Sequence, residues 1–99
     1  MIIANLAIFP TSEGVSVSRY VKKVLQVIHE SGLKSQTGGM STTIEAPDLK
    51  SLFEVIEKAH KALIDQGVKR IHVDLQIDHR LDKNATIGSK LRSLDKTDE

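Results

Sequence analysis

The stretch that decides the fold is Lys69-Arg70-Ile71-His72-Val73-Asp74-Leu75-Gln76-Ile77-Asp78-His79-Arg80, in which apolar and polar residues alternate from Ile71 to Asp78. An alternation with a period of two is typical of a β-strand that has one face in a core. The other face then presents a polar row: Arg70, His72, Asp74, Gln76, Asp78 and Arg80. This row is either a solvated surface or a binding site.

The other elements follow from hydrophobic periodicity and turn residues. Strands are predicted at residues 2–9, 33–37 and 42–46, and helices at residues 17–30, 48–65 and, shorter, 87–94. Up to Arg80 the order is β-α-β-β-α-β. This order predicts an α+β protein with a ferredoxin-like fold, in which two helices cover one face of a four-stranded antiparallel sheet.

Length and composition indicate one small domain, which we place at residues 1–95, with residues 96–99 as a frayed tail. The 14 basic and 13 acidic side chains give a net charge of +1, so no charged patch for nucleic acid or anionic lipid is expected. No segment approaches the ~20 apolar residues that span a bilayer. Because the chain also lacks cysteine, we expect a soluble, cytoplasmic protein without nucleic-acid or membrane partners.

One face of the predicted sheet carries no helix. If Ile2, Ala4, Leu6 and Ile8 point toward the helices, the opposite face of this strand shows Ile3, Asn5, Ala7 and Phe9. This surface is too apolar to lie comfortably in water. We therefore expect a second copy of the chain to cover it, as a homodimer or homotetramer built through the sheets.

Catalytic and metal sites have little support in the sequence. His72 and Asp74 share a strand face with Asp78, but ligands on one strand alone fall short of a metal signature, and solvated or cross-strand paired charges are the favoured explanation. His60 lies on the apolar stripe of a helix and is read as a histidine at the edge of the core. Gly38-Gly39 lacks the Gly-Lys-Ser/Thr ending of a phosphate loop and predicts a turn or bulge. No nucleophile motif is present, so we expect neither catalytic residues nor a metal.

Thr42 and Glu45 lie on a strand that we expect to be central. A hydroxyl group and a carboxylate there can orient a cationic or amine-bearing ligand. Ordinary strand composition is the alternative explanation.

A set of short motifs, kept in one order along the chain, carries a family resemblance. They are Pro10 at the end of the first strand, Ser18-x-Tyr20-Val21, Ser31-Gly32-Leu33, Gly39-Met40-Ser41-Thr42-Thr43-Ile44-Glu45, Ala59-His60-x-Ala62-Leu63, Gly67-x-x-Arg70, Ile77-Asp78-x-Arg80 and Lys90. From about Ile2 to Leu94 the chain resembles the YkoF-like thiamine-binding proteins. The resemblance implies a cytosolic, non-catalytic homo-oligomer that binds thiamine or its hydroxymethylpyrimidine moiety and needs no cofactor.

Thiamine combines a cationic thiazolium ring with an aminopyrimidine ring. A receptor therefore needs carboxylates near the cation and paired donors and acceptors for the ring edge. The residues predicted to contact such a ligand are Asn5, Met40, Thr42, Glu45, Asp74 and Asp78. The alternative function is a structural or regulatory homo-oligomerisation domain without a dedicated ligand, and an enzyme ranks third.

Overall fold

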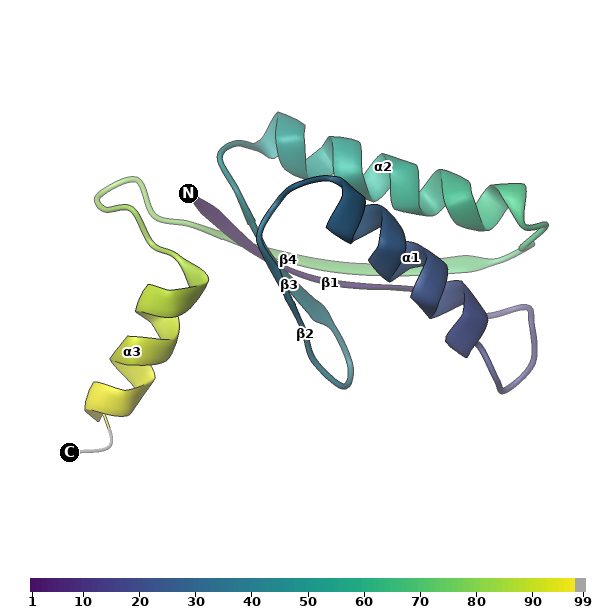
Figure 1. Ribbon diagram of the computed structural model, residues 1–99, viewed down its shortest axis with the longest axis horizontal. Coiled ribbons are helices and arrows are strands. Elements are labelled where there is room, and N and C mark those ends of the chain that lie inside the picture. Colours follow the sequence, from purple (N-terminus) through teal and green to yellow (C-terminus); the bar gives the residue numbers. More distant parts are fainter. Residues whose placement is uncertain (98–99) are drawn as a thin grey trace.

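The computed structural model describes residues 1–97. Its elements follow in the order β1 (Ile2–Pro10), α1 (Ser18–Glu30), β2 (Ser35–Thr37), β3 (Thr42–Ala46), α2 (Leu49–Asp65), β4 (Ile71–His79) and α3 (Ile87–Thr97). The strands form one antiparallel sheet in the order β2-β3-β1-β4, and α1 and α2 lie together on one face of it (Figure 1). This confirms the predicted α+β architecture. Helix α3 is longer than expected, and residues 98 and 99 of the predicted frayed tail lie outside the described residues.

The core lies between the sheet and the two helices. Alternate side chains of β1 point into it, as the sequence predicted: Ile2, Ala4, Leu6 and Ile8. They meet Tyr20, Val24 and Ile28 from α1, and Leu52, Val55, Ala59 and Leu63 from α2. Burial of these apolar side chains holds the two layers together.

The sequence of α2 predicts a buried apolar stripe, of which the structure buries only a part; the stripe comprises Leu49, Leu52, Phe53, Ile56, Ala59, Leu63 and Ile64. The buried positions follow Leu52, Val55, Ala59 and Leu63, whereas Phe53 and Ile64, which share the apolar stripe, are exposed. The stripe is broader than the sheet can cover. His60 lies outside the buried face and is exposed, so its interpretation as a core-edge histidine is wrong.

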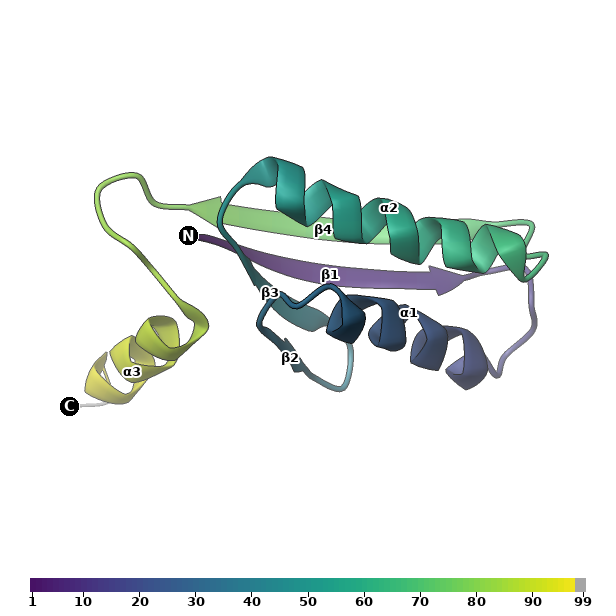
Figure 2. The ribbon, with the colours of Figure 1, turned by 45° about the horizontal axis from the view of Figure 1, so that its top comes forward.

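The third helix lies apart from the other two. Figures 1 and 2 show α3 beyond one end of the sheet, reached by a long loop from β4, with the chain's N-terminus nearby. Ile3 of β1 and Ile87 of α3 are both buried, and both line one groove on the sheet face opposite α1 and α2. This face, called the open face below, is therefore covered at one end by the chain itself.

Strand β4 forms an edge of the sheet, because it pairs with β1 alone. Two of its apolar side chains on the helix side, Val73 and Ile77, remain exposed. A long edge strand with unpaired backbone groups is a surface that another strand can extend. Among the described residues, no helix is both long and apolar enough to cross a membrane.

Candidate functional site

The strand register places polar side chains in rows across the open face. Asn5 lies opposite Thr43 of β3 and Gln76 of β4, so three polar side chains cross the middle of the sheet. Two residues along β1, Ala7 lies opposite Asp74. Paired residues on neighbouring antiparallel strands project on the same side and lie about 5 Å apart. The rows therefore form a polar surface with the small Ala7 side chain as a shallow floor.

Asn5 and Asp74 are placed to meet a ligand on this surface. The Asn5 Oδ1 atom accepts a hydrogen bond of 2.7 Å from the Ser41 hydroxyl, which fixes the amide and leaves its N–H groups to donate elsewhere. Asp74 is exposed, and its carboxylate makes no hydrogen bond or ion pair within the described part of the chain. An amide donor and a carboxylate thus lie in adjacent rows.

An aromatic pair borders the same surface. The Phe9 and His72 rings lie 5.0 Å apart between centroids and are tilted by 35°. Tyr20 is buried in the core on the helix side, and Phe53 is on the outer face of α2. Phe9 is therefore the phenylalanine or tyrosine placed to contact a ring on the open face.

Glu45 has a structural partner. Its side chain is 5 % exposed, and Oε1 accepts a hydrogen bond of 2.5 Å from the backbone N–H of Ile87, the first residue of α3. A carboxylate at this position satisfies a helix N-terminal donor and interacts favourably with the helix dipole. Glu45 therefore fastens α3 to the sheet, and its predicted contact with a ligand remains a prediction.

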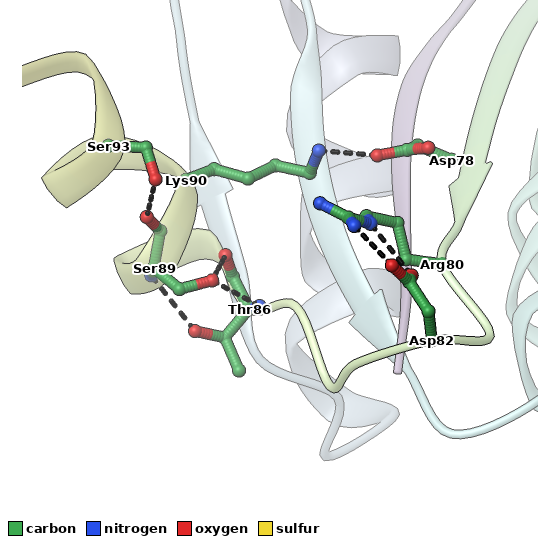
Figure 3. Close-up of polar contacts among 7 residues, drawn as sticks. All are labelled: Asp78, Arg80, Asp82, Thr86, Ser89, Lys90 and Ser93. Atoms are coloured by element: carbon green, nitrogen blue, oxygen red, sulfur yellow. Dashed lines mark hydrogen bonds and ion pairs between the residues drawn. The ribbon is translucent and has the colours of Figure 1, made fainter. Parts of the chain in front are cut away.

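Asp78 is also joined to α3. Its carboxylate forms an ion pair with the ammonium group of Lys90, as Figure 3 shows. The hydrogen bond from Lys90, aided by its charge, lowers the pKa of the Asp78 carboxyl group below its ordinary value. Both groups are about half exposed, so this pair orients Lys90 more than it stabilises the fold.

Met40 and Thr42 belong to the other side of the sheet. Thr42 pairs with the core residue Leu6 and is buried, and Met40 is 93 % exposed in the turn between β2 and β3. Both line a cleft of about 250 Å³ between this hairpin and α1, whose walls include Val21 and Leu25. The structure therefore divides the six predicted residues between two surfaces. It brings Asn5, Glu45, Asp74 and Asp78 to the open face, and Met40 and Thr42 to the cleft.

The strand period explains which polar residues the sequence reading missed. Thr42 and Glu45 are three residues apart and must project to opposite faces of a strand, whereas Thr43 shares the face of Glu45. Gln76 belongs to the polar row of β4 and joins Asn5 through the register. The alternation of side chains along the strand is enough to predict that Thr43 shares a face with Glu45. That Gln76 lies beside Asn5 could not be predicted in this way, because it depends on the order of the strands in the sheet.

The described residues offer few side chains for catalysis or metal binding. All four histidines, His29, His60, His72 and His79, are exposed, and in the described part of the chain none is hydrogen-bonded to a carboxylate. Over the same residues, no group of three or more histidine or acidic side chains is arranged to hold a metal ion. The Gly38-Gly39 segment forms the β2–β3 turn, where the Gly38 N–H donates to the Ser41 carbonyl over 2.8 Å.

The fold places this protein in the class of α+β proteins with a ferredoxin-like sheet, and one face of that sheet carries rows of polar side chains. Comparison with known proteins gives the family: the family model described as "Thiamine-binding protein" matches residues 4–95. The chain belongs to this family, in agreement with the resemblance seen in its sequence motifs.

The chain is also similar to UPF0045 proteins over nearly its whole length. The chain is 37 % identical to the UPF0045 protein MJ1052 of Methanocaldococcus jannaschii, over 94 % of this chain and 91 % of the relative. It is 38 % identical to the UPF0045 protein YqgV of Bacillus subtilis, over 97 % and 96 % of the two chains. The crystal structure of MJ1052 superposes with a TM-score of 0.88 and covers 96 % of both chains.

A more distant structure shares the fold. It is a Thermotoga maritima protein with a proposed role in thiamine biosynthesis or salvage, which superposes with a TM-score of 0.80. The alignment covers 94 % of this chain and 97 % of the other, at 20 % identity. At that identity the likeness shows the fold alone.

Proposed function

We propose that this protein binds thiamine or its hydroxymethylpyrimidine moiety without transforming it. The observation that carries the proposal is the pairing of a fixed amide, Asn5, with an exposed carboxylate, Asp74, in adjacent rows of the open face, in a chain that matches the thiamine-binding family model. The thiamine-related role proposed for the Thermotoga maritima relative points the same way.

In the proposed complex the pyrimidine ring lies over the row of Thr43, Asn5 and Gln76. Hydroxyl and amide groups supply the donors and acceptors that the aminopyrimidine edge needs. The thiazolium cation lies toward Asp74, whose carboxylate compensates its charge. Phe9 is within reach as an apolar neighbour of either ring.

Self-association belongs to this proposal. The free edge of β4 and the partly exposed Phe9 offer a surface for a second copy of the chain, which would enclose a ligand between the two. Without enclosure, the open face is too shallow to remove most of a ligand from water. Sedimentation should therefore show a dimer or tetramer at micromolar concentration, and a monomer that binds thiamine tightly would contradict the shared site.

The test of ligand binding is a calorimetric titration with thiamine and, separately, hydroxymethylpyrimidine. Asp74→Asn should weaken thiamine binding by about tenfold or more and leave hydroxymethylpyrimidine binding unchanged, because the neutral fragment has no cation. Asp65→Asn removes an equal charge on the outer face of α2 and serves as the control. Failure of both compounds to bind the parent protein would refute the proposal.

A second candidate function, an assembly domain without a ligand, is favoured by the free β4 edge. It predicts a stable oligomer in which Asn5 and Asp74 bind groups of the second copy. Asp74→Asn would then change the dissociation of the oligomer, whereas in the binding proposal it changes thiamine affinity alone.

A further inference from the structure

A cationic cavity lies between α3 and the loop that precedes it, next to the open face. Its volume is about 490 Å³. Three cationic and three neutral polar side chains line it: Arg80, Lys83, Lys90, Asn84, Ser89 and Ser93. Figure 3 shows four of these, with Lys90 and Arg80 reaching from opposite sides toward the same region. Among the residues whose side chains the structure describes, no acidic side chain lines this cavity.

At this end of the molecule cationic groups outnumber carboxylates among the described residues, although the net charge of the whole chain is only +1. The N-terminal ammonium group donates a hydrogen bond of 2.7 Å to Asn84 Oδ1 and adds a fourth cation. The carboxylates of Asp78 and Asp82 bind Lys90 and Arg80 respectively. Lys83 forms no ion pair with any described residue. Among the described side chains, two carboxylates therefore face four cations.

The paired cations still have donors to offer. An ammonium group has three N–H donors and a guanidinium group has five. Lys90 uses one donor on Asp78, and Arg80 uses two on Asp82. The carboxylates hold the two cations in place and leave N–H groups for an anion. A doubly charged phosphate group is the anion that best matches several convergent cationic donors.

Two backbone N–H groups at the start of α3 already have acceptors within the chain. The Ile87 N–H donates to Glu45, and the Ser89 N–H donates over 3.0 Å to Thr86 Oγ1. These helix N-terminal donors are already satisfied. Recognition of an anion here would depend on the side chains, above all on lysine and arginine.

Lys90 connects this cavity to the proposed ligand site. It also borders a groove of about 290 Å³ on the open face, together with Ile3 and Thr43. Its partner Asp78 lies opposite Ile3, and Ile3 is two residues from Asn5 along β1. Two residues of a strand span about 7 Å, so a pyrimidine over Asn5 whose methylene group faces Ile3 directs its phosphate toward the end of the open face where Asp78 and Lys90 lie.

We infer that the open face also binds a phosphate monoester of the pyrimidine, with the phosphate held by Lys90 and assisted by Lys83 and Arg80. This inference rests on the proposed function, because the ring must lie over Asn5. The methylene carbon that bears the phosphate in the ester bears the thiazolium ring in thiamine, so the pyrimidine of the ester lies turned end for end relative to that of thiamine: its methylene group points toward Lys90, whereas that of thiamine points toward Asp74. The row of Asn5 lies between Lys90 and Asp74.

The test compares hydroxymethylpyrimidine with its phosphate monoester by calorimetric titration of the full chain. The ester should bind the parent protein at least tenfold more tightly than hydroxymethylpyrimidine, the alcohol. Inorganic phosphate should compete with binding of the ester and should not compete with binding of the alcohol. Lys90→Gln should remove the advantage of the ester and leave the alcohol unchanged. Lys61→Gln, which removes a lysine from the outer face of α2, should change neither affinity.

Asp78→Asn separates recognition of phosphate from positioning of α3. If Lys90 binds the phosphate, loss of the competing carboxylate charge should leave ester binding as tight as before or tighten it severalfold. If Lys90 acts only by fastening α3, Asp78→Asn and Lys90→Gln should weaken both compounds alike, which would overturn the inference. Equal binding of ester and alcohol by the parent would also overturn it and leave the proposed function standing. Failure of the alcohol to bind would instead refute the proposed function.

Discussion

The buried carboxylate of Glu45 should control whether α3 stays docked on the sheet. Glu45→Ala leaves the buried Ile87 N–H without its acceptor. The loss of a charged partner for a buried donor costs about 2 kcal/mol, and Glu45→Gln, which retains an acceptor oxygen, should lose about 1 kcal/mol. These changes should act mainly on α3, because the Glu45 carboxylate binds the backbone of its first residue.

Amide hydrogen exchange measures this directly. A loss of about 2 kcal/mol corresponds to roughly 30-fold faster exchange of the α3 amides through local opening. The amides of β1, whose strand is central in the sheet, should exchange at nearly the parent rate in Glu45→Ala. Glu57→Ala, an exposed position on α2, is the control and should alter neither set. Unchanged α3 exchange in Glu45→Ala, or equal acceleration over the whole sheet, would refute the assignment of Glu45 to α3 docking.

Three further predictions test local features. Asp48 accepts a hydrogen bond from the Ser51 N–H over 2.8 Å at the start of α2, which lowers its pKa, so Asp48→Ala removes the helix N-cap and should lower the midpoint of unfolding in urea titrations. Gly67 has φ +81°, so Gly67→Ala should cost about 1 kcal/mol in the same assay, whereas Gly39→Ala, without a positive φ, should cost less. Lys90→Gln should raise the pKa of the Asp78 carboxyl group toward its ordinary value, as followed by carboxyl carbon NMR. The pKa of Asp78 is lower in the folded parent protein than in the unfolded chain. The stabilisation from its ion pair with Lys90 is therefore fully present at a pH above the ordinary carboxyl pKa, and it is lost as the pH falls through the lowered pKa of the folded state.

Strand alternation was sufficient to predict much of this fold. The period of two in residues 71–78 predicted β4, and the apolar run ended by Pro10 predicted β1. Because successive side chains of a strand project to opposite faces, Ile2 and Leu6 in the core are separated from Asn5 and Ala7 on the open face. Such local patterns are reliable because one buried face fixes the register of a strand. The helices were predictable for the same reason, although the exposed Phe53 shows that periodicity does not tell how much of a broad apolar stripe the sheet covers.

The candidate site was less predictable, because its contacts join residues distant in sequence. Asp78 and Lys90 meet only because α3 returns to the end of the sheet, and Glu45 meets Ile87 in the same way. Spacing along the chain contains no information on that return. It also could not show that these two acidic groups are occupied by α3, which leaves Asp74 as the exposed carboxylate next to the row of Asn5.

The central claim is that thiamine or its pyrimidine binds on the open face of the sheet. A nitrogen–proton correlation NMR titration of the full chain with thiamine tests it most directly, since each amide reports its own surroundings. Binding on the open face should give the largest shifts at the side-chain amides of Asn5 and Gln76 and at the backbone of Ala7 and Asp74. Shifts confined to Met40, Val21 and Leu25 in the cleft beside α1, or no shifts at all, would contradict it.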